Sequence, residues 1–481
     1  MNMGQKGSWT MRNKSRYKRF AAVLMVLLFM LPSMMAVRAE MLPAVQASSY
    51  ILYEPDRDLV LFEKDAEQRI FPASMTKILT AILVEEYIAP DEIVIVGSEI
   101  LNIPSDSSLA NHKVGDAISG ENLLRGLIIP SGNETACIVA MHVARKVSGD
   151  ANMTYADAEQ YFCNMMNEKA KEFGAKDTNF TNPHGYHAAT HYTTAYDLAL
   201  ITREAMKSAL ISRIATETLY VGPSAIVAVD SGLQITNHNW PTHNKLIQDG
   251  AEGYAYATGL KTGYTEPAGE CLAATAEKDG RRLIVIVCNS PSEARWVDAK
   301  NLFEYGFTQF ADRVLLEEGQ LMGSVEMANP QLGDEMSLEY FAAEGFSAFL
   351  SEEQFANVTC EVAVDPMRIV VNPPDAETGE PDDVQRIAPP IAEGEEIGTV
   401  TYSVAGEVLF TGALVAGRSV EARTFNSDVD HYMKIVFSTS AIPYWIVGVL
   451  LLAAVVVVIV ILVRRGGGRR NGRYHFQKRR W

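Results

Sequence analysis

Cysteine is scarce in this sequence and is not arranged in pairs. The 481 residues contain five cysteines, an odd number, and no two of them form a Cys-x-x-Cys motif. This argues against the disulfide framework of small secreted domains. Cys271 and Cys288 fall in neighbouring predicted strands, so a pair between them stays open beside the expectation that they are buried free thiols. The remaining cysteines are Cys137, Cys163 and Cys360.

Acidic residues are absent from the first 39 positions. This stretch carries seven basic residues, six of them within the first 19, before the apolar run Phe20 to Val37. The run ends in Val37-Arg38-Ala39, a small-residue cleavage pattern. The pattern predicts a secretory signal peptide at residues 1–39, cut after Ala39, with an uncleaved anchor as the alternative.

Acidic residues are also absent from the last 18 positions, which follow an uncharged apolar run from Tyr444 to Val463. A run of this length crosses the roughly 30 Å hydrocarbon layer as a helix, so we predict a transmembrane helix at residues 443–463. The tail, residues 464–481, carries eight basic side chains. The positive-inside rule places such a tail in the cytoplasm and the rest of the chain outside. A buried helix in a soluble domain is the alternative.

All 59 acidic residues therefore lie between the two ends, where 27 basic residues accompany them. The predicted exported part has a net charge near −32, although the whole chain has −17. A surface this acidic repels nucleic acids and anionic lipid, so the composition excludes polyanion binding as the function.

Hydrophobic patterning divides the region between the ends in two. In residues 48–310, strand-like segments at both ends enclose helical ones. This order predicts an α/β fold of the α+β type, with an antiparallel sheet flanked by helices, rather than βαβ repeats. Residues 311–425 show short alternating segments separated by turn residues, which predict a smaller β-rich domain.

Ser74 and Lys77 form a Ser-x-x-Lys pair at the start of an apolar run with helical period. The pair alone is weak evidence, because the same pattern occurs at Ser15 and Lys18. Residues i and i+3 of a helix lie about 5–6 Å apart, so the Lys77 amine can take the Ser74 proton if it is neutral. A free lysine has a pKa near about 10.4, so we expect desolvation and a second cation, Lys261, to lower the pKa of Lys77.

Two further motifs occur once each, Ser131-Gly132-Asn133 in a break between helical segments and Lys261-Thr262-Gly263 on a predicted strand. The Ser131 hydroxyl can relay a proton and the Asn133 amide can hold a substrate carbonyl, with a simple helix cap as the alternative. Lys261 and Thr262 suit a terminal carboxylate, and Gly263 lets a substrate backbone approach the strand. We expect backbone N–H groups of Ser74 and Tyr264 to form an oxyanion hole.

These three motifs, in this order, are shared by class A β-lactamases and penicillin-binding proteins. Over residues 48–310 the chain resembles the low-molecular-mass penicillin-binding proteins of the D-alanyl-D-alanine carboxypeptidase type, serine peptidases of family S11. The likeness extends to Asn182-Pro183-His184-Gly185 and to the segment from His191 to Leu198. The β-rich region resembles the family's C-terminal domain more loosely.

The resemblance implies removal of the terminal D-alanine from peptidoglycan stem pentapeptides through an acyl-enzyme, and acylation of the same serine by β-lactams. Cleavage of peptidoglycan cross-links by a DD-endopeptidase is the alternative. No cofactor or metal is implied. The implied roles are Ser74 as nucleophile, Lys77 as general base, Ser131 as catalytic relay, Lys261 as carboxylate-binding residue, and Asn133, Thr262 and Gly263 as substrate contacts.

The chain departs from the family pattern in two places. Many relatives attach to the membrane through an amphipathic C-terminal helix, whereas this chain has a full transmembrane segment. The stretch from Ser131 to Lys261 is long, which predicts an insertion near residues 212–250 bordering the site.

Three other functions are less consistent with the residues. A class A β-lactamase needs Glu-x-x-Leu-Asn after the second motif, and no glutamate after Ser131 has it. A zinc peptidase would use the cluster His184, His187 and His191, yet Pro183 and Gly185 indicate a loop, and His-Glu-x-x-His is missing. An inactive wall-binding scaffold would be expected to have lost a motif residue, and all are present.

Overall fold

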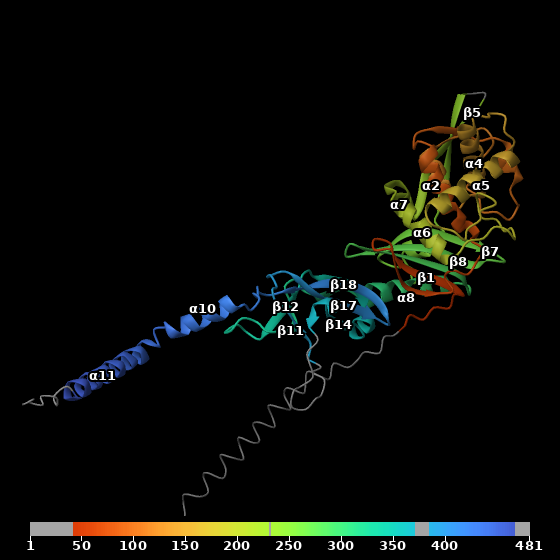
Figure 1. Ribbon diagram of the computed structural model, residues 1–481. Coiled ribbons are helices and arrows are strands. Elements are labelled where there is room, and N and C mark those ends of the chain that lie inside the picture. Colours follow the sequence, from red (N-terminus) through yellow and green to blue (C-terminus); the bar gives the residue numbers. More distant parts are fainter. Residues whose placement is uncertain (1–41, 230–231, 371–383, 467–481) are drawn as a thin grey trace, which may run out of the picture. The chain divides into compact units, whose positions relative to one another are not determined.

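The computed structural model describes residues 42–229, 232–370 and 384–466 (Figure 1). The predicted signal peptide at residues 1–39 and the tail beyond residue 466 lie outside these ranges. Contacts divide the chain into two compact units, one ending at Phe310 and the other beginning at Ala311.

The first unit contains a five-stranded antiparallel sheet with the strand order β2-β1-β9-β8-β7. The first strand after the leader therefore pairs with the last strand of the unit, and the predicted antiparallel sheet is confirmed. The strands are β1 Ser49–Glu54, β2 Leu59–Lys64, β7 Ala257–Thr265, β8 Gly269–Lys278 and β9 Arg281–Ser290.

Helices cover both faces of this sheet. Residues 283–288 of β9 are all buried, and successive side chains of a strand point to opposite faces. Ile284 and Ile286 belong to the same core as Ile201 of α6 (Ala195–Met206), whereas Leu283 lies against Gly306 of α8 (Ala294–Gln309). The helices α6 and α8 thus lie on opposite faces, which accounts for a strand without polar alternation.

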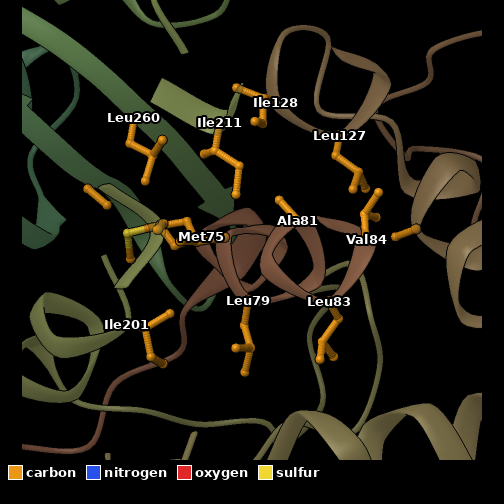
Figure 2. Packing of buried hydrophobic residues seen from close by; sticks show 14 of the residues in the cluster. Met75, Leu79, Ala81, Leu83, Val84, Leu127, Ile128, Ile201, Ile211 and Leu260 are labelled. Carbon is orange, nitrogen blue, oxygen red and sulfur yellow. The ribbon is translucent and has the colours of Figure 1, made fainter. Parts of the chain in front are cut away.

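Helix α2 (Lys77–Tyr87) lies at the centre of the main core. It is apolar on nearly all sides, which is typical of a buried helix, and neighbours surround it on the other helices and on β7 (Figure 2). The side chains that Figure 2 labels on these neighbours are Leu127 and Ile128 of α3, Ile201 of α6, Ile211 of α7 and Leu260 of β7. The bounds of the other helices here are α3 Gly120–Ile128, α4 Asn133–Ser148, α5 Tyr155–Glu172 and α7 Ala209–Ala215.

A second sheet of the first unit has the order β3-β4-β5-β6. Its long hairpin, β5 (Leu219–Val229) and β6 (Gly232–Pro241), lies within the segment where we predicted an insertion. The shorter strands are β3 (Ile93–Ile95) and β4 (Asp116–Ser119), and β4 pairs with β5.

The second unit is rich in strands and has a core of its own, which includes Val325, Leu338, Val400 and Leu414. Its larger sheet has the order β14-β17-β18-β12-β11-β16-β15, and β10 pairs with β13 in a separate sheet. The strands are β10 Phe310–Leu316, β11 Leu321–Met327, β12 Ser337–Ala342, β13 Phe346–Ser351, β14 Thr359–Val364, β15 Ile369–Val370, β16 Arg386–Ile387, β17 Glu396–Val404 and β18 Glu407–Ala416, with the short helix α9 Glu352–Ala356.

Two helices follow the strands of the second unit. The stretch between the β-rich domain and the predicted membrane segment contains a helix, α10 (Phe425–Val436), which begins with a capping box between Thr424 and Ser427. Within the described residues, Ile442–Arg465 of α11 (Ile442–Gly466) is the one helix long and apolar enough to cross a membrane. It coincides with the predicted span.

Candidate active site

Ser74 lies in a short 3-10 turn, η2 (Ala73–Thr76), which leads directly into α2. The α-helix therefore begins at Lys77 and not at Ser74 as the sequence predicted. The Thr76 hydroxyl fixes the turn, because its Oγ1 donates to the Ala73 carbonyl at 2.8 Å and lies 2.9 Å from His191 Nε2. This turn holds Ser74 at the entrance of the helix.

The Lys77 side chain is fully buried and meets three oxygen atoms. Its Nζ lies 3.0 Å from Ser74 Oγ, 2.7 Å from Asn133 Oδ1 and 2.7 Å from the His184 carbonyl. Burial is the main reason why the pKa of Lys77 lies well below its usual value, and the charge of Lys261 is the second. A neutral amine has two N–H groups and one lone pair, so donation to Asn133 and His184 leaves the lone pair for the Ser74 hydroxyl.

The second motif joins α3 to α4. Ser131 is buried and has a left-handed backbone (φ 62°), which is uncommon for a residue with a side chain. Asn133 begins α4, and its side chain reaches Lys77. Within the described residues, the Lys77 amine forms no hydrogen bond with Ser131. Ser131 is linked to the site by the chain, because it lies two residues before Asn133.

The third motif, Lys261-Thr262-Gly263, lies on β7, which is an edge strand of the five-stranded sheet. The Lys261 Nζ donates to the Thr262 carbonyl at 3.1 Å. Burial and the nearby Arg295 guanidinium lower the pKa of Lys261 to about 7. Tyr264 follows the motif with a side chain that is 61% exposed.

Gly263 lies close to the turn that carries Ser74. A Cβ at this position would lie 3.0 Å from the Pro72 carbonyl oxygen, 3.2 Å from Ala73 Cβ and 3.3 Å from the Ser74 nitrogen. Gly263 therefore lets β7 approach the turn that carries Ser74.

A pocket of ≈ 390 Å³ opens at Ser74. Three of the predicted site residues, Ser74, Asn133 and Tyr264, line it. The other lining residues come from the loop before β4, from the loop after α5 and from the turn between β7 and β8: Asp106, Ser107, Ser108, Gly185, Tyr186, His187, Thr265, Glu266 and Pro267.

Two contributors to the site escape sequence reasoning. Arg295 of α8 donates to the Gly263 carbonyl at 3.3 Å and forms an ion pair with Glu270 of β8, which places a second cation beside Lys261. The His184 carbonyl is the third partner of Lys77. A backbone carbonyl has no sequence signature, and an arginine in the first turn of an amphipathic helix looks like a surface residue.

Two of the three clustered histidines, His184 and His191, have hydrogen-bond partners within the protein. His191 accepts from the Thr181 N–H at 2.9 Å and meets Thr76, and His184 accepts from the Tyr186 N–H at 3.1 Å. Burial lowers the pKa of His184 and of His191 to about 3, so both stay neutral. No group of three or more His, Cys, Asp or Glu side chains among the described residues is placed to hold a metal ion.

All five cysteines are free thiols, and Cys271 and Cys288 form no disulfide. Cys360, on β14, is the exposed one of the five.

Comparison with known proteins supplies the family. Residues 35–292 match the sequence profile of the D-alanyl-D-alanine carboxypeptidases, peptidase family S11. The chain belongs to this family. Among curated members, D-alanyl-D-alanine carboxypeptidase DacF of Bacillus subtilis is 28% identical over 390 residues, which cover 79% of this chain and 88% of DacF. For DacD of Escherichia coli the identity is 27% over 333 residues, 67% of this chain and 78% of DacD.

Solved structures of D-alanyl-D-alanine carboxypeptidases and related enzymes share the fold. Penicillin binding protein 5 from Haemophilus influenzae is 25% identical with a TM-score of 0.51, covering 79% of this chain and 99% of that structure. The Streptomyces K15 DD-transpeptidase is 27% identical with a TM-score of 0.51, covering 56% of this chain and 99% of that structure. The predicted low-molecular-mass penicillin-binding protein, a serine D-alanyl-D-alanine carboxypeptidase and hence a hydrolase, is confirmed.

Proposed function

We propose that Ser74 carries out this carboxypeptidase reaction as a nucleophile, with Lys77 as its general base. The observation that supports this most strongly is the buried Lys77 amine, 3.0 Å from Ser74 Oγ and bound on its other sides by Asn133 and the His184 carbonyl. Since its pKa is lowered, the amine takes the hydroxyl proton as Oγ attacks a substrate carbonyl.

The substrate is a peptidoglycan stem peptide that ends in D-alanyl-D-alanine. Ser74 Oγ forms an ester with the penultimate D-alanine, the peptide bond breaks, and the terminal D-alanine leaves with a proton on its nitrogen. Ser131 relays that proton from Lys77 to the leaving nitrogen. Water then hydrolyses the ester and restores Ser74.

Binding groups surround this chemistry. Lys261, with Thr262, receives the terminal carboxylate, while Asn133 and the β7 backbone at Gly263 contact the substrate. The backbone N–H groups of Ser74 and Tyr264 stabilise the oxyanion. The short distance between the Gly263 position and the Ser74 nitrogen supports this pairing, since it brings the two backbone segments together.

A fluorescent penicillin tests the acylation step. The purified protein should become covalently labelled, because a β-lactam amide meets the same nucleophile and leaves a stable ester. The Ser74→Ala variant should take up no label. A wild-type protein without label, or a labelled Ser74→Ala variant, would refute the role of Ser74.

Carboxypeptidase and endopeptidase activities share this acyl-enzyme, so labelling does not separate them. Mass spectrometry after incubation with a stem pentapeptide and with a cross-linked muropeptide does. We expect the pentapeptide to lose one alanine. An intact pentapeptide beside a cleaved cross-link would instead identify a DD-endopeptidase.

We also propose that α11 anchors the protein in the cell membrane with the catalytic unit outside. The apolar length of α11 and the basic residues after it support this orientation. The anchor would keep the active site beside the cell wall, where its substrate lies.

A further inference from the structure

One wall of the active-site pocket is an irregular loop, residues 106–112, which we call the wall loop. Asp106, Ser107 and Ser108 from this loop line the same pocket as Ser74. The loop contains no helix or strand of its own. Its position therefore depends on the groups that bind its backbone.

The first turn of α4 holds the wall loop from one side. The Asn133 N–H donates to the Ser108 carbonyl at 2.8 Å. The neighbouring Glu134 carboxylate, which is buried, accepts from the Asn111 N–H at 2.6 Å and from the His112 N–H at 3.4 Å. Because Asn133 also binds Lys77, a shift of the wall loop would act directly on the residues around the nucleophile.

The β5–β6 hairpin holds the wall loop from the other side. The Trp240 indole Nε1–H donates to the Ala110 carbonyl at 2.9 Å, and both residues are buried. His238 Nε2 lies 3.3 Å from the Asn111 carbonyl. The His112 ring packs edge-on against the rings of His238 and Trp240, with centroids 5.5 and 5.7 Å apart.

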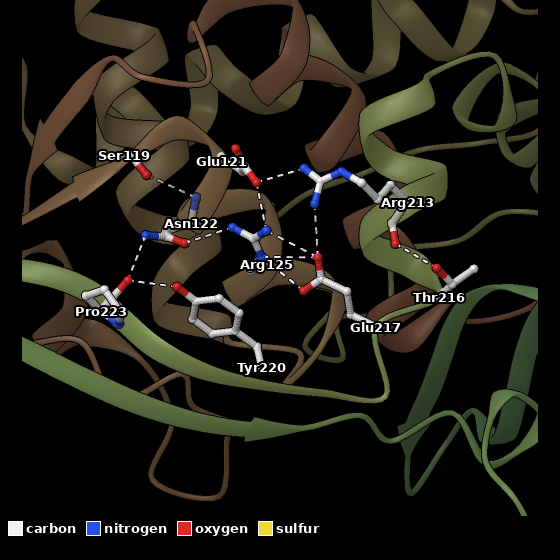
Figure 3. Close-up of polar contacts among 9 residues, drawn as sticks. All are labelled: Ser119, Glu121, Asn122, Arg125, Arg213, Thr216, Glu217, Tyr220 and Pro223. Carbon is white, nitrogen blue, oxygen red and sulfur yellow. Dashed lines mark hydrogen bonds and ion pairs between the residues drawn. The ribbon is translucent and has the colours of Figure 1, made fainter.

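The hairpin is itself fixed to α3. Trp240 packs on Tyr220, with ring centroids 5.5 Å apart, and the Arg125 guanidinium lies 4.7 Å from the Tyr220 ring. Figure 3 shows Arg125 between Glu121 and Glu217, with Arg213 joining the same carboxylates. A continuous set of contacts thus runs from α3 through the hairpin to the wall loop.

We propose that Trp240 is a positioning residue for the acylation of Ser74: its indole N–H holds the wall loop against Asn133 and so maintains the pocket. The proposal rests on the proposed function. It assigns the hairpin within the predicted insertion a part in the reaction, although Trp240 does not line the pocket and touches no reacting atom.

Trp240→Phe tests this role because it removes the N–H donor and keeps an aromatic ring between Tyr220 and His238. The control is Tyr220→Phe, which removes a hydroxyl from the same aromatic stack, where it donates to the Pro223 carbonyl away from the wall loop. Loss of one buried hydrogen bond should slow acylation by a fluorescent penicillin about threefold to tenfold in Trp240→Phe. Tyr220→Phe should react at the wild-type rate.

Amide hydrogen exchange separates positioning from general destabilisation. We expect the amides of Asn111 and His112 to exchange faster in Trp240→Phe, while those of α2 and β9 stay unchanged. If Trp240→Phe does not fold, 3-benzothienylalanine incorporated at position 240 decides in its place, since sulfur replaces the indole N–H that bonds the Ala110 carbonyl and the two-ring shape is kept.

The results of these experiments distinguish a failure of the Trp240 role from a failure of the proposed function. A wild-type protein that takes no label refutes the acyl-enzyme and with it this role. A labelled wild type together with a folded variant that reacts at the wild-type rate, or exchanges as the wild type does in the wall loop, overturns the role of Trp240 alone.

Discussion

At the scale of one residue, the surroundings of the Lys77 amine favour the general-base role that we propose for it. Its burial removes the solvation that stabilises an ammonium ion, and Lys261 adds repulsion. Asn133 and His184 offer acceptors for the two N–H groups of the neutral amine. The arrangement therefore suits the uncharged form, with its lone pair directed at Ser74.

This electrostatic arrangement predicts a pH dependence. Lys77 acts only when neutral, so the acylation rate should rise with pH through its pKa in the folded protein and then level off. Lys261→Gln removes one cause that lowers this pKa, so the acidic limb of the profile should move to higher pH, together with a lower rate. Stopped-flow acylation by a penicillin across the pH range measures both. A limb that stays in place or moves to lower pH would show that Lys261 does not tune Lys77.

Gly263 gives a second prediction for a single residue. Gly263→Ala would press a methyl group against the turn that carries Ser74, at the distances given above. Overpacking of this kind should cost about 1–3 kcal/mol of unfolding free energy. Displacement of the nucleophile should lower the acylation rate about 100-fold.

Gly222→Ala is the matched control for this substitution. A Cβ at Gly222 meets its nearest atom, Tyr220 Oη, at an ordinary 3.4 Å. The acylation rate and the thermal unfolding temperature of Gly263→Ala and Gly222→Ala are to be measured and compared. Equal rates in Gly263→Ala and the wild type would contradict the close approach of β7 to Ser74.

Residue identities made the candidate cluster predictable, because Ser74, Lys77, Asn133 and Lys261 belong to motifs whose side chains suit specific chemical roles. The geometry agrees with sequence reasoning that the pKa of Lys77 must be lowered. Other contributions were not predictable from residue type. The His184 carbonyl acts through its backbone, and Arg295 acts from a helix distant in sequence.

At the scale of elements, the first and last strands of the catalytic unit and its amphipathic helices could be predicted from apolar periodicity. The conformation of the Ser74 turn could not, because residues i and i+3 lie on the same side of both a 3-10 turn and an α-helix. Length alone suggested an insertion near residues 212–250. Its form as a hairpin that reaches the wall loop depends on long-range contacts such as the one between Trp240 and Ala110.

The ion-pair network between α3, α7 and the loop before β5 predicts a difference between two arginines. Arg125→Met removes a half-buried guanidinium from Glu121, Glu217 and the Tyr220 ring, which should cost about 1–3 kcal/mol of unfolding free energy. The control, Arg69→Met, removes an exposed ion pair with Asp177 and should leave stability unchanged within error. Denaturant unfolding monitored in the two variants tests this. An equal effect in both would show that the network contributes nothing beyond surface charge.

At the scale of the whole molecule, the chain combines an acidic central region with the apolar helix α11 and a basic end. This combination favours an enzyme held at the outer face of the cell membrane, and Cys360 provides a direct test of that orientation. Cys360 is exposed on the second unit, whereas the other four cysteines are buried. A membrane-impermeant maleimide should therefore label this protein when it is added to intact cells.

Cys360→Ser is the control for the orientation test and should abolish the labelling. If the wild-type protein reacts only after the cells are lysed, the second unit lies inside and the proposed orientation is wrong.

Above all, we propose that a β-lactam or a stem peptide acylates Ser74. The most direct measurement is mass spectrometry of the penicillin-treated protein after proteolysis, with the adduct located on its peptide. We expect one penicilloyl group, on the peptide that contains Ser74, and none in Ser74→Ala. An adduct on any other residue, or an unmodified wild-type protein, would contradict it.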